Sequence, residues 1–131
     1  MDDAVRRFLE SNHGAVMVTL RKDGTPHAVR VGVGVVDGKL WSSGTQTRVR
    51  TKHLRRDPRA TLWVMSDSPW RWITIESHVT LLEGDDAPQQ NLALYRALRG
   101  DPDDIDEYLE AMRTERRLIY EFSIDRVYGQ Y

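Results

Sequence analysis

Apolar and polar residues alternate with a period of two through much of the first two thirds of the chain. Such alternation is typical of strands that bury one face. The dipeptide Asp37-Gly38 lies between two alternating runs and is a strong signal for a two-residue hairpin turn. The predicted strands cover residues 15–20, 26–36, 39–43, 60–66 and 72–84. The pattern therefore predicts an antiparallel sheet rather than a parallel α/β sheet.

Helical spacing of apolar residues appears on both sides of this region. Val5, Phe8 and Leu9 predict a helix over residues 2–11, which the glycine at position 14 is expected to end. Beyond residue 86, apolar residues recur every three or four positions in two runs separated by RGDPDD, which predicts a helical hairpin. Residues 118–124 return to alternation and form the sixth predicted strand.

Together the elements predict an α+β fold dominated by β structure. The expected architecture is a six-stranded antiparallel barrel with an N-terminal helix, a short helix after the third strand and a helical hairpin before the last strand. The chain of 131 residues has the length of one domain and contains no internal repeat or linker, so we expect a single domain over residues 1–131.

Composition removes several classes of function. No apolar run approaches the ~20 residues of a membrane helix, and the acidic N-terminus does not resemble a signal peptide, so we expect a cytoplasmic protein without membrane contact. The absence of cysteine excludes disulfides and thiolate metal sites.

The histidines lie far apart without ligand spacing, so no metal site is predicted: His13, His27, His53 and His78. Ser77, His78 and Asp85 could compose a triad on paper, but no motif marks one.

Positive charge is concentrated in one stretch, residues 44–59, called the basic segment below. It holds six of the 19 basic residues and one acid: Arg48, Arg50, Lys52, Arg55, Arg56, Arg59 and Asp57. Thr45 and Thr47 are N-cap candidates for a helix that Pro58 ends. A helix N-terminus presents free N–H groups and partial positive charge, which suits a phosphate.

On such a helix Arg48 and Lys52 lie one turn apart and could converge with the threonine hydroxyls on one anion, while Arg50 points towards a second negative group. A solvated helix face with Val49 and Leu54 packed inward explains the same pattern. A nucleic-acid groove would need aromatic residues among the cations, and the basic segment has none. With a net charge of −1 as well, we expect no nucleic-acid partner and favour a small phosphorylated cofactor.

The second predicted strand has two contrasting faces. Four valines, at positions 29, 31, 33 and 35, share one face, which is expected in the core. Arg30, Gly32 and Gly34 share the other face, where the glycines leave backbone bare for the approach of a flat ligand. A bulge or a bend of the barrel accounts for the glycines equally well.

Two stretches, TRVRTKHLRRDPRATLWV at 47–64 and RRLIYEFSIDRVYG at 116–129, carry a family likeness across nearly the whole chain. The sequence resembles the FMN-binding split β-barrel group of flavin and deazaflavin oxidoreductases related to pyridoxamine 5′-phosphate oxidase. The likeness is strongest to branch B, whose members bind the deazaflavin coenzyme F420. The resemblance implies a split β-barrel and a homodimer with cofactor pockets at the subunit interface.

The resemblance also implies roles for residues at matching positions. Those of the basic segment hold the phosphate or the acidic tail of the cofactor, the flat ring lies against the second strand, and a C-terminal segment approaches the pocket of the neighbouring subunit. The implied cofactor-binding residues are His27, Arg30, Val31, Thr45, Thr47, Arg48, Arg50, Lys52 and Tyr128.

The expected activity is hydride transfer between reduced F420 and an unidentified small organic acceptor, with the chemistry supplied by the cofactor. No catalytic residue is assigned, because no convincing nucleophile or acid–base pair is present. Relatives often carry Lys-x-Arg-Asn where this chain has Arg50-Thr51-Lys52-His53, which keeps FMN as an alternative cofactor. An FMN-dependent oxidoreductase and a non-catalytic carrier of a flavin, deazaflavin or haem-like ligand are the alternative functions.

Overall fold

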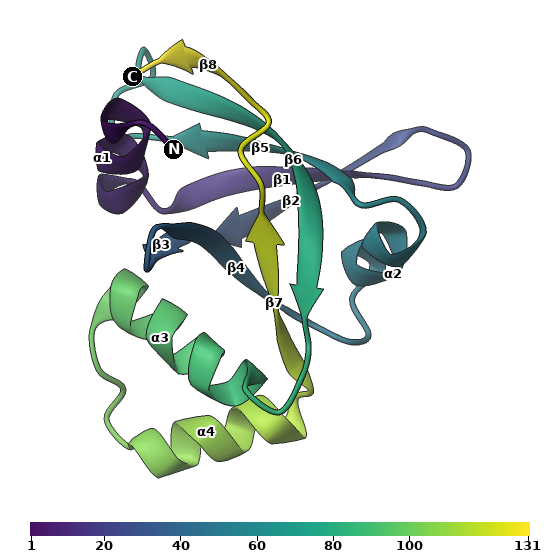
Figure 1. Cartoon of the computed structure of the whole chain (residues 1–131), viewed down its shortest axis with the longest axis vertical. Helices are drawn as coiled ribbons and strands as arrows, with labels where there is room; N and C mark the ends of the chain where they lie inside the picture. The colour runs from purple at the N-terminus through teal and green to yellow at the C-terminus, as the bar shows by residue number, and fades with distance from the viewer.

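Eight strands and four helices make up the computed structural model, which describes residues 1–131 (Figure 1). In chain order they are α1 (Asp3–Ser11), β1 (Gly14–Leu20), β2 (Pro26–Gly32), β3 (Gly34–Val36), β4 (Lys39–Thr45), α2 (Val49–Arg56), β5 (Arg59–Met65), β6 (Trp72–Leu82), α3 (Ala87–Arg99), α4 (Ile105–Thr114), β7 (Arg117–Phe122) and β8 (Arg126–Gln130). None of the four helices is long and apolar enough to span a membrane.

The strands form one antiparallel sheet in the order β2-β1-β5-β6-β7-β4-β3, with β8 added alongside β6. The sheet curls so that β2 approaches β4, but these two strands do not pair. Ser42 Oγ donates to the Gly32 carbonyl at 2.7 Å and joins them at one end. We call the region between Pro26–Gly32 and the unpaired edge of residues 42–45 the seam. It is the split of an incomplete barrel, so the predicted split β-barrel is confirmed in outline.

The predicted number of six strands is wrong. Residues 26–36 divide at Val33, whose N–H donates to the His13 carbonyl at 2.8 Å, and the chain then leaves β1 to pair with β4. The eighth strand, β8, pairs with the first half of β6, whose second half pairs with β7. Alternation over residues 72–84 revealed the long strand but not its change of partner.

That change of partner is fixed by hydrogen bonds around His78. Its backbone N–H donates to Ser123 Oγ at 2.8 Å, and its Nδ1 lies 2.6 Å from Asp125 Oδ2. The Asp125 N–H donates to the Glu76 carbonyl at 3.0 Å, which starts the new pairing. His78 therefore bonds Asp125 rather than Asp85, and this cluster holds the crossover between β7 and β8.

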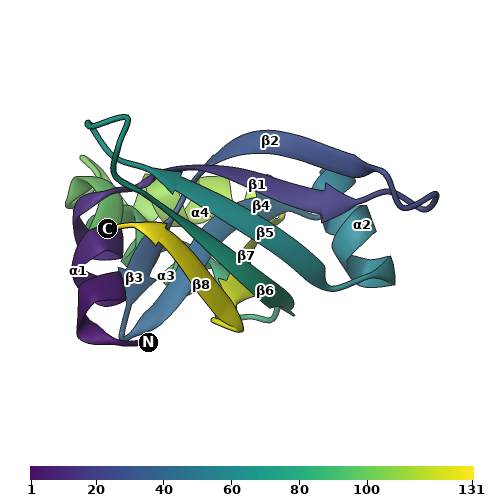
Figure 2. The ribbon, with the colours of Figure 1, turned by 90° about the horizontal axis from the view of Figure 1, so that it is seen from above.

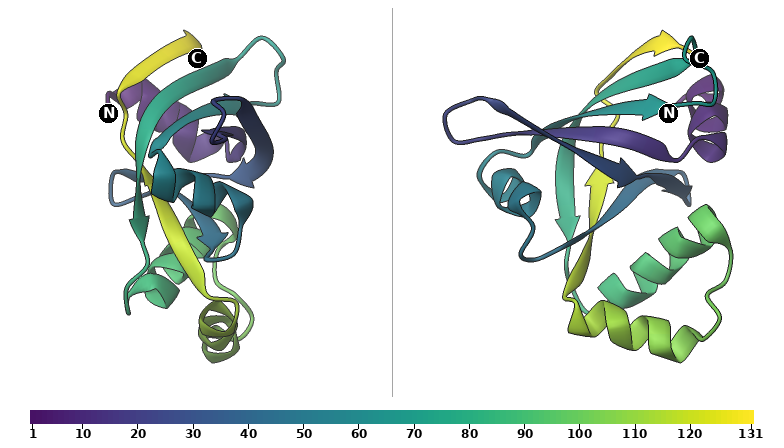
Figure 3. Two further views of the ribbon diagram at one scale, coloured as in Figure 1. Left: turned by 90° about the vertical axis from the view of Figure 1, so that its right-hand side faces the viewer. Right: turned by 180° about the vertical axis from the view of Figure 1, so that it is seen from behind.

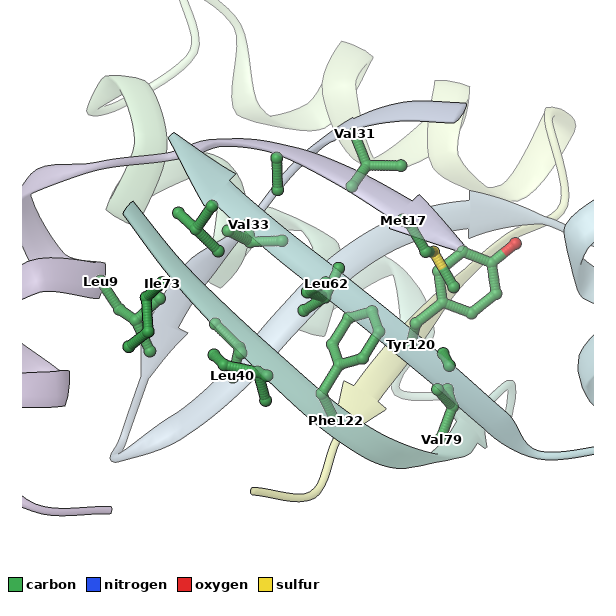
Figure 4. Close-up of a cluster of buried hydrophobic side chains, with 14 of the residues drawn as sticks. Leu9, Met17, Val31, Val33, Leu40, Leu62, Ile73, Val79, Tyr120 and Phe122 are labelled. Atoms are coloured by element: carbon green, nitrogen blue, oxygen red, sulfur yellow. The ribbon is translucent and has the colours of Figure 1, made fainter. Parts of the chain in front are cut away.

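The barrel is filled from the inward faces of the strands and from α1 (Figure 4). Leu9, Met17, Leu62 and Ile73 are completely buried, as the alternation and the helical spacing predicted. Helix α1 starts where Asp2 accepts a hydrogen bond from the Val5 N–H at 2.9 Å. It ends at an extended Asn12 instead of at Gly14, which already belongs to β1, so the predicted glycine cap is wrong.

Helices α3 and α4 form the predicted hairpin and pack on the other face of β3, β4 and β7 (Figure 1). A side chain at Gly34 would come within 3.1 Å of Leu94 and 3.2 Å of Leu98. At Gly32 it would reach Leu98 at 3.7 Å. The absence of side chains at Gly32 and Gly34 thus leaves room for α3, and helix packing explains both glycines.

A second glycine contact closes the far end of the barrel. Tyr120 of β7 is fully buried, and a Cβ at Gly44 of β4 would overlap its ring and hydroxyl. The hydroxyl continues past Gly44 to form a hydrogen bond with Thr51 Oγ1 in α2. Gly44 is therefore required by the path of the tyrosine across β4.

We expect Gly44→Ala to lower the free energy of unfolding by about 3 kcal/mol, because the added methyl overlaps a buried ring. Gly84→Ala is the control, since a Cβ at Gly84 meets nothing within 4 Å, and its effect should stay within about 0.5 kcal/mol. Urea denaturation of both variants measures the difference. Equal free energies of unfolding for the Gly44→Ala and Gly84→Ala variants would contradict the assigned role of Gly44.

Candidate functional site

Helix α2 lies beside the point where β2 and β4 diverge at the seam (Figure 3). It begins at Val49 and ends at Arg56, with Arg48 as an N-cap that makes no side-chain capping bond. The prediction that Thr45 or Thr47 caps the helix is therefore wrong. Their hydroxyls lie 3.4 Å apart, in the turn that leads into the helix. This turn leaves the helix N-terminus uncapped by any side chain.

Side chains of α2 attach to β4, which borders the seam, and to β1, the neighbour of β2. On the β4 side, Thr51 Oγ1 donates to the Thr45 carbonyl at 2.7 Å and bonds the Tyr120 hydroxyl. On the β1 side, His53 Nδ1 lies 2.8 Å from Thr19 Oγ1. Arg56 donates to the Leu20 carbonyl. The helix is thus a bridge between two strands of the barrel that do not pair with each other.

Three of the six cations of the basic segment are occupied by other groups. Arg55 makes a bidentate pair with Glu83, at 2.8 and 2.9 Å, and Arg59 pairs with Asp57 at 2.8 Å. The third is Arg56, which bonds backbone as described above. Arg48 and Lys52 are exposed and form no ion pair, so they remain available to a ligand.

Arg50 is held in an unusual position. Its guanidinium lies 5.5 Å above the Tyr120 ring, and its Nη2 donates to the Ser43 carbonyl at 3.5 Å. Its Nε is buried without a hydrogen-bond partner. Burial lowers the pKa of Arg50, and the positive charges of Arg48 and Arg117 lower it further. An anion placed here would gain a donor and relieve the repulsion among three cations.

His27 supplies the second unpartnered group. Its Nδ1 and the Nε of Arg50 are the two buried side-chain atoms in the chain that lack a partner. The His27 ring meets the His53 ring edge to face at 5.1 Å, beneath α2. Leaving a buried polar atom unpaired costs about 1–3 kcal/mol. Both exceptions occur next to α2, one on each side of the seam, which makes this place the candidate site.

The free edge of β2 adds backbone groups to the site. β2 is the last strand of the sheet and pairs only with β1, so its other edge has unpaired N–H and C=O groups. Such an edge can form hydrogen bonds with the polar atoms along one side of a flat heterocycle. Val31, one of the predicted ring contacts, is 9% exposed and belongs to the barrel core.

Two predicted residues lie outside the seam of their own chain. Arg30 is on the opposite face of β2, with its guanidinium near Gly14. Tyr128 is on β8, four strand positions from β2, or about 19 Å at the usual spacing. It contacts Trp72, with ring centroids 6.5 Å apart. The structure does not bring Tyr128 together with the basic segment within one chain.

The face that carries Tyr128 is called the outer face. It comprises the outward side of β2, β1, β5, β6 and β8, and apart from the contact of α3 at Gly32 no helix lies over it (Figure 2). Trp63 is 40% exposed there and lies 6.4 Å from Trp72 between ring centroids. Sequence reasoning treated Trp63 only as a strand residue. Its outward position could have been found from its alternation with Leu62 and Val64, which are buried.

Sequence reasoning also missed Tyr120 and Thr51 as parts of the site. Alternation places Tyr120 inside the barrel, but only the tertiary structure shows that its hydroxyl reaches Thr51 and that its ring supports Arg50. Thr51 is completely buried although it lies in a highly charged run. Neither contact leaves a local signal in the sequence.

A protein-family model described as pyridoxamine 5′-phosphate oxidase matches residues 1–131. Among solved structures, a conserved hypothetical protein from Mycobacterium tuberculosis is similar with a TM-score of 0.82 and 21% identity, over 97% of this chain and 82% of that one. An F420 reductase is similar with a TM-score of 0.78 and 18% identity, over 99% of this chain and 100% of that one. A FAD-binding protein from Mesorhizobium loti is similar with a TM-score of 0.66 and 12% identity, over 97% of this chain and 92% of that one. These structural likenesses show a shared fold.

The buried His53 predicts how stability depends on pH. Burial lowers its pKa from the usual 6.5, and His27, Arg56 and Arg21 add repulsion. The unfolded chain therefore takes up a proton that the folded chain resists, so the free energy of unfolding should decrease as the pH falls below about 6.5. Urea denaturation at pH 7.5 and 5.5 measures this slope. His53→Asn should flatten it, and an unchanged slope would contradict the assignment.

Proposed function

The chain belongs to the pyridoxamine 5′-phosphate oxidase family, and from this premise we propose that it is an oxidoreductase dependent on coenzyme F420. It transfers a hydride between the reduced deazaflavin and a small organic acceptor. The observation that carries the proposal is the pair of unpartnered buried atoms, Arg50 Nε and His27 Nδ1, on either side of the seam. The similar fold of an F420 reductase supports the choice of cofactor.

The residues at the seam fit such a cofactor. A phosphate needs positive charge and donors, and Arg48, Arg50 and Lys52 provide both without competing carboxylates. A flat polar ring needs donors and acceptors along one side, which the free edge of β2 and His27 provide. When bound, the cofactor supplies the hydride chemistry that the side chains themselves lack.

The chain's own contribution is position and electrostatics. The Tyr120 ring and its bond to Thr51 fix the helix that carries the cations, so the positive charge is oriented before an anion arrives. The filled barrel interior behind the seam, with Met17 and Leu62 fully buried, keeps water from that side of the site. A ring held at the β2 edge is thereby oriented with one face towards solvent and acceptor.

FMN is the second candidate cofactor. Arg50 occupies the place where relatives carry lysine, and the structure shows it stacked on Tyr120 with one face buried. This leaves Arg48 and Lys52 as two exposed cations without an ion pair, which is enough for one phosphate. The similar fold of a FAD-binding protein is compatible with a flavin.

We further propose that the working unit is a homodimer joined through the outer face. A sheet surface that exposes Trp63 and Tyr128, at 40% and 47%, is typical of an interaction surface. Tyr128 lies four strand positions from β2 along the sheet and contacts Trp72 on the outer face. In a two-fold dimer it can contribute to the seam of the partner subunit, which agrees with the role that the family resemblance implies.

Titration of the apoprotein with F420 and with FMN tests the cofactor. We expect F420 to bind more tightly, as measured by fluorescence of the deazaflavin. Arg48→Ala combined with Lys52→Ala should weaken binding about tenfold or more, because charge-assisted hydrogen bonds contribute ~1.5–3 kcal/mol each. Tight FMN binding without affinity for F420 would overturn the proposed cofactor.

The matched control removes two charges elsewhere, with Arg7→Ala and Lys22→Ala, both exposed and without ion pairs. This double variant should leave the affinity for F420 unchanged. Turnover with reduced F420 and candidate acceptors then separates an enzyme from a carrier, since a carrier oxidises no more than one equivalent.

The dimer is tested by sedimentation velocity. Trp63→Glu places a charge in the centre of the outer face and should convert the dimer to a monomer. Ile105→Glu, at a position of similar exposure (39%) on α4, should leave it dimeric. A wild-type monomer, or a Trp63→Glu variant that stays dimeric, would overturn the proposed interface.

A further inference from the structure

A separate cavity of about 370 Å³ lies beneath the helical hairpin, between α3, α4 and the face of the sheet that points away from the barrel core. Helix α3 packs on β3, β4 and β7, while α4 diverges from α3 and touches the sheet at β7 (Figures 1 and 3). This volume falls in the range of sites for small organic ligands, about 300–1,000 Å³. None of the residues assigned to the cofactor lines it.

The walls of the cavity are aromatic and apolar. Tyr95 of α3 and Tyr108 of α4 pack together with ring centroids 4.9 Å apart and a tilt of 57°. Both are half-buried. Leu94, Leu98 and Met112 complete the apolar lining. A flat ring placed here would bury its faces against side chains that are already ordered, which favours aromatic ligands.

The polar groups at the inner end are already satisfied and rigid. Ser43 Oγ donates to Asn91 Oδ1 at 2.5 Å, and the Tyr108 hydroxyl donates to the Asn91 carbonyl at 3.1 Å. Arg117 is paired with Glu115 at 2.8 Å. These groups therefore shape the cavity without demanding a charged partner.

Arg99 is different, because it lines the cavity and pairs with no carboxylate. Its guanidinium lies 6.0 Å from the centre of the Tyr95 ring. Of the three acids in the following loop, Asp101 is bound by Arg96 at 2.6 Å and Asp104 caps α4 by accepting from the Glu107 N–H. The third, Asp103, does not line the cavity. An open cation beside an aromatic wall suits the carboxylate of an aromatic acid.

We propose that this cavity is a binding site for a small aromatic carboxylate, with Arg99 bonding the acid and the tyrosine pair packing against the ring. None of the residues assigned to the cofactor lines the cavity, so the proposal does not depend on the identity of the cofactor. Its inner end is formed by Ser43, whose carbonyl also bonds Arg50, so the two sites share one residue of β4.

The probe is 2-naphthoate, with 2-naphthamide as its neutral counterpart, titrated into the full-length protein and followed by backbone amide NMR. We expect saturable shifts confined to α3, α4 and Ser43, and binding of naphthamide at least about fivefold weaker. Arg99→Gln should remove this preference. Arg96→Gln, on the same exposed helix turn but paired with Asp101, should preserve it.

Each alternative outcome overturns the proposal. Shifts that cluster in β2 and α2 or on the outer face would place the ligand elsewhere. Equal affinity for the acid and the amide, or an acid preference that survives Arg99→Gln, would remove the role of the arginine. Because the readout is binding to the apoprotein, a failure here leaves the cofactor proposal intact, and failure of F420 binding leaves this one intact.

Discussion

The passage of Tyr120 across the bare backbone of Gly44 is the contact on which the site depends. It lets one core residue fill the end of the barrel and still reach α2 with its hydroxyl. The same ring supports the guanidinium of Arg50. Packing of the core and orientation of charge are therefore properties of one side chain, and the helix cannot shift without disturbing both.

In this arrangement some cations of the basic segment are used in contacts that hold the fold, and the others remain available to a ligand. Salt bridges and backbone bonds hold the C-terminal half of α2 and the chain beyond it, as the pairs Arg55–Glu83 and Arg59–Asp57 show. The first turn is left with cations that have no acidic neighbours. The seam is thus a strand edge without a pairing partner that carries positive charge at one end, and the proposed cofactor site rests on this combination.

Much of the fold could be predicted from the sequence because its signals are local. The period of two, the helical spacing of Val5, Phe8 and Leu9, and the break between α3 and α4 all appeared in the structure. The strand count was wrong because the division at Val33 and the partner change of β6 depend on hydrogen bonds to distant residues. For the site, the charge cluster and the nearby strand were predicted, but which cations are free was not, since Arg55 finds Glu83 at a separation of 28 residues.

The aromatic residues of the outer face give this protein an optical property. No tryptophan belongs to the main core; Trp41 lies with Leu94 and Ile119 under the hairpin, and the other three lie on or next to the outer face. Intrinsic fluorescence therefore reports on surfaces rather than on the barrel interior. Emission from Trp63, Trp70 and Trp72 responds to what covers the outer face, while Trp41 responds to the docking of α3. The molecule thus carries separate native probes for association and for movement of its helical hairpin.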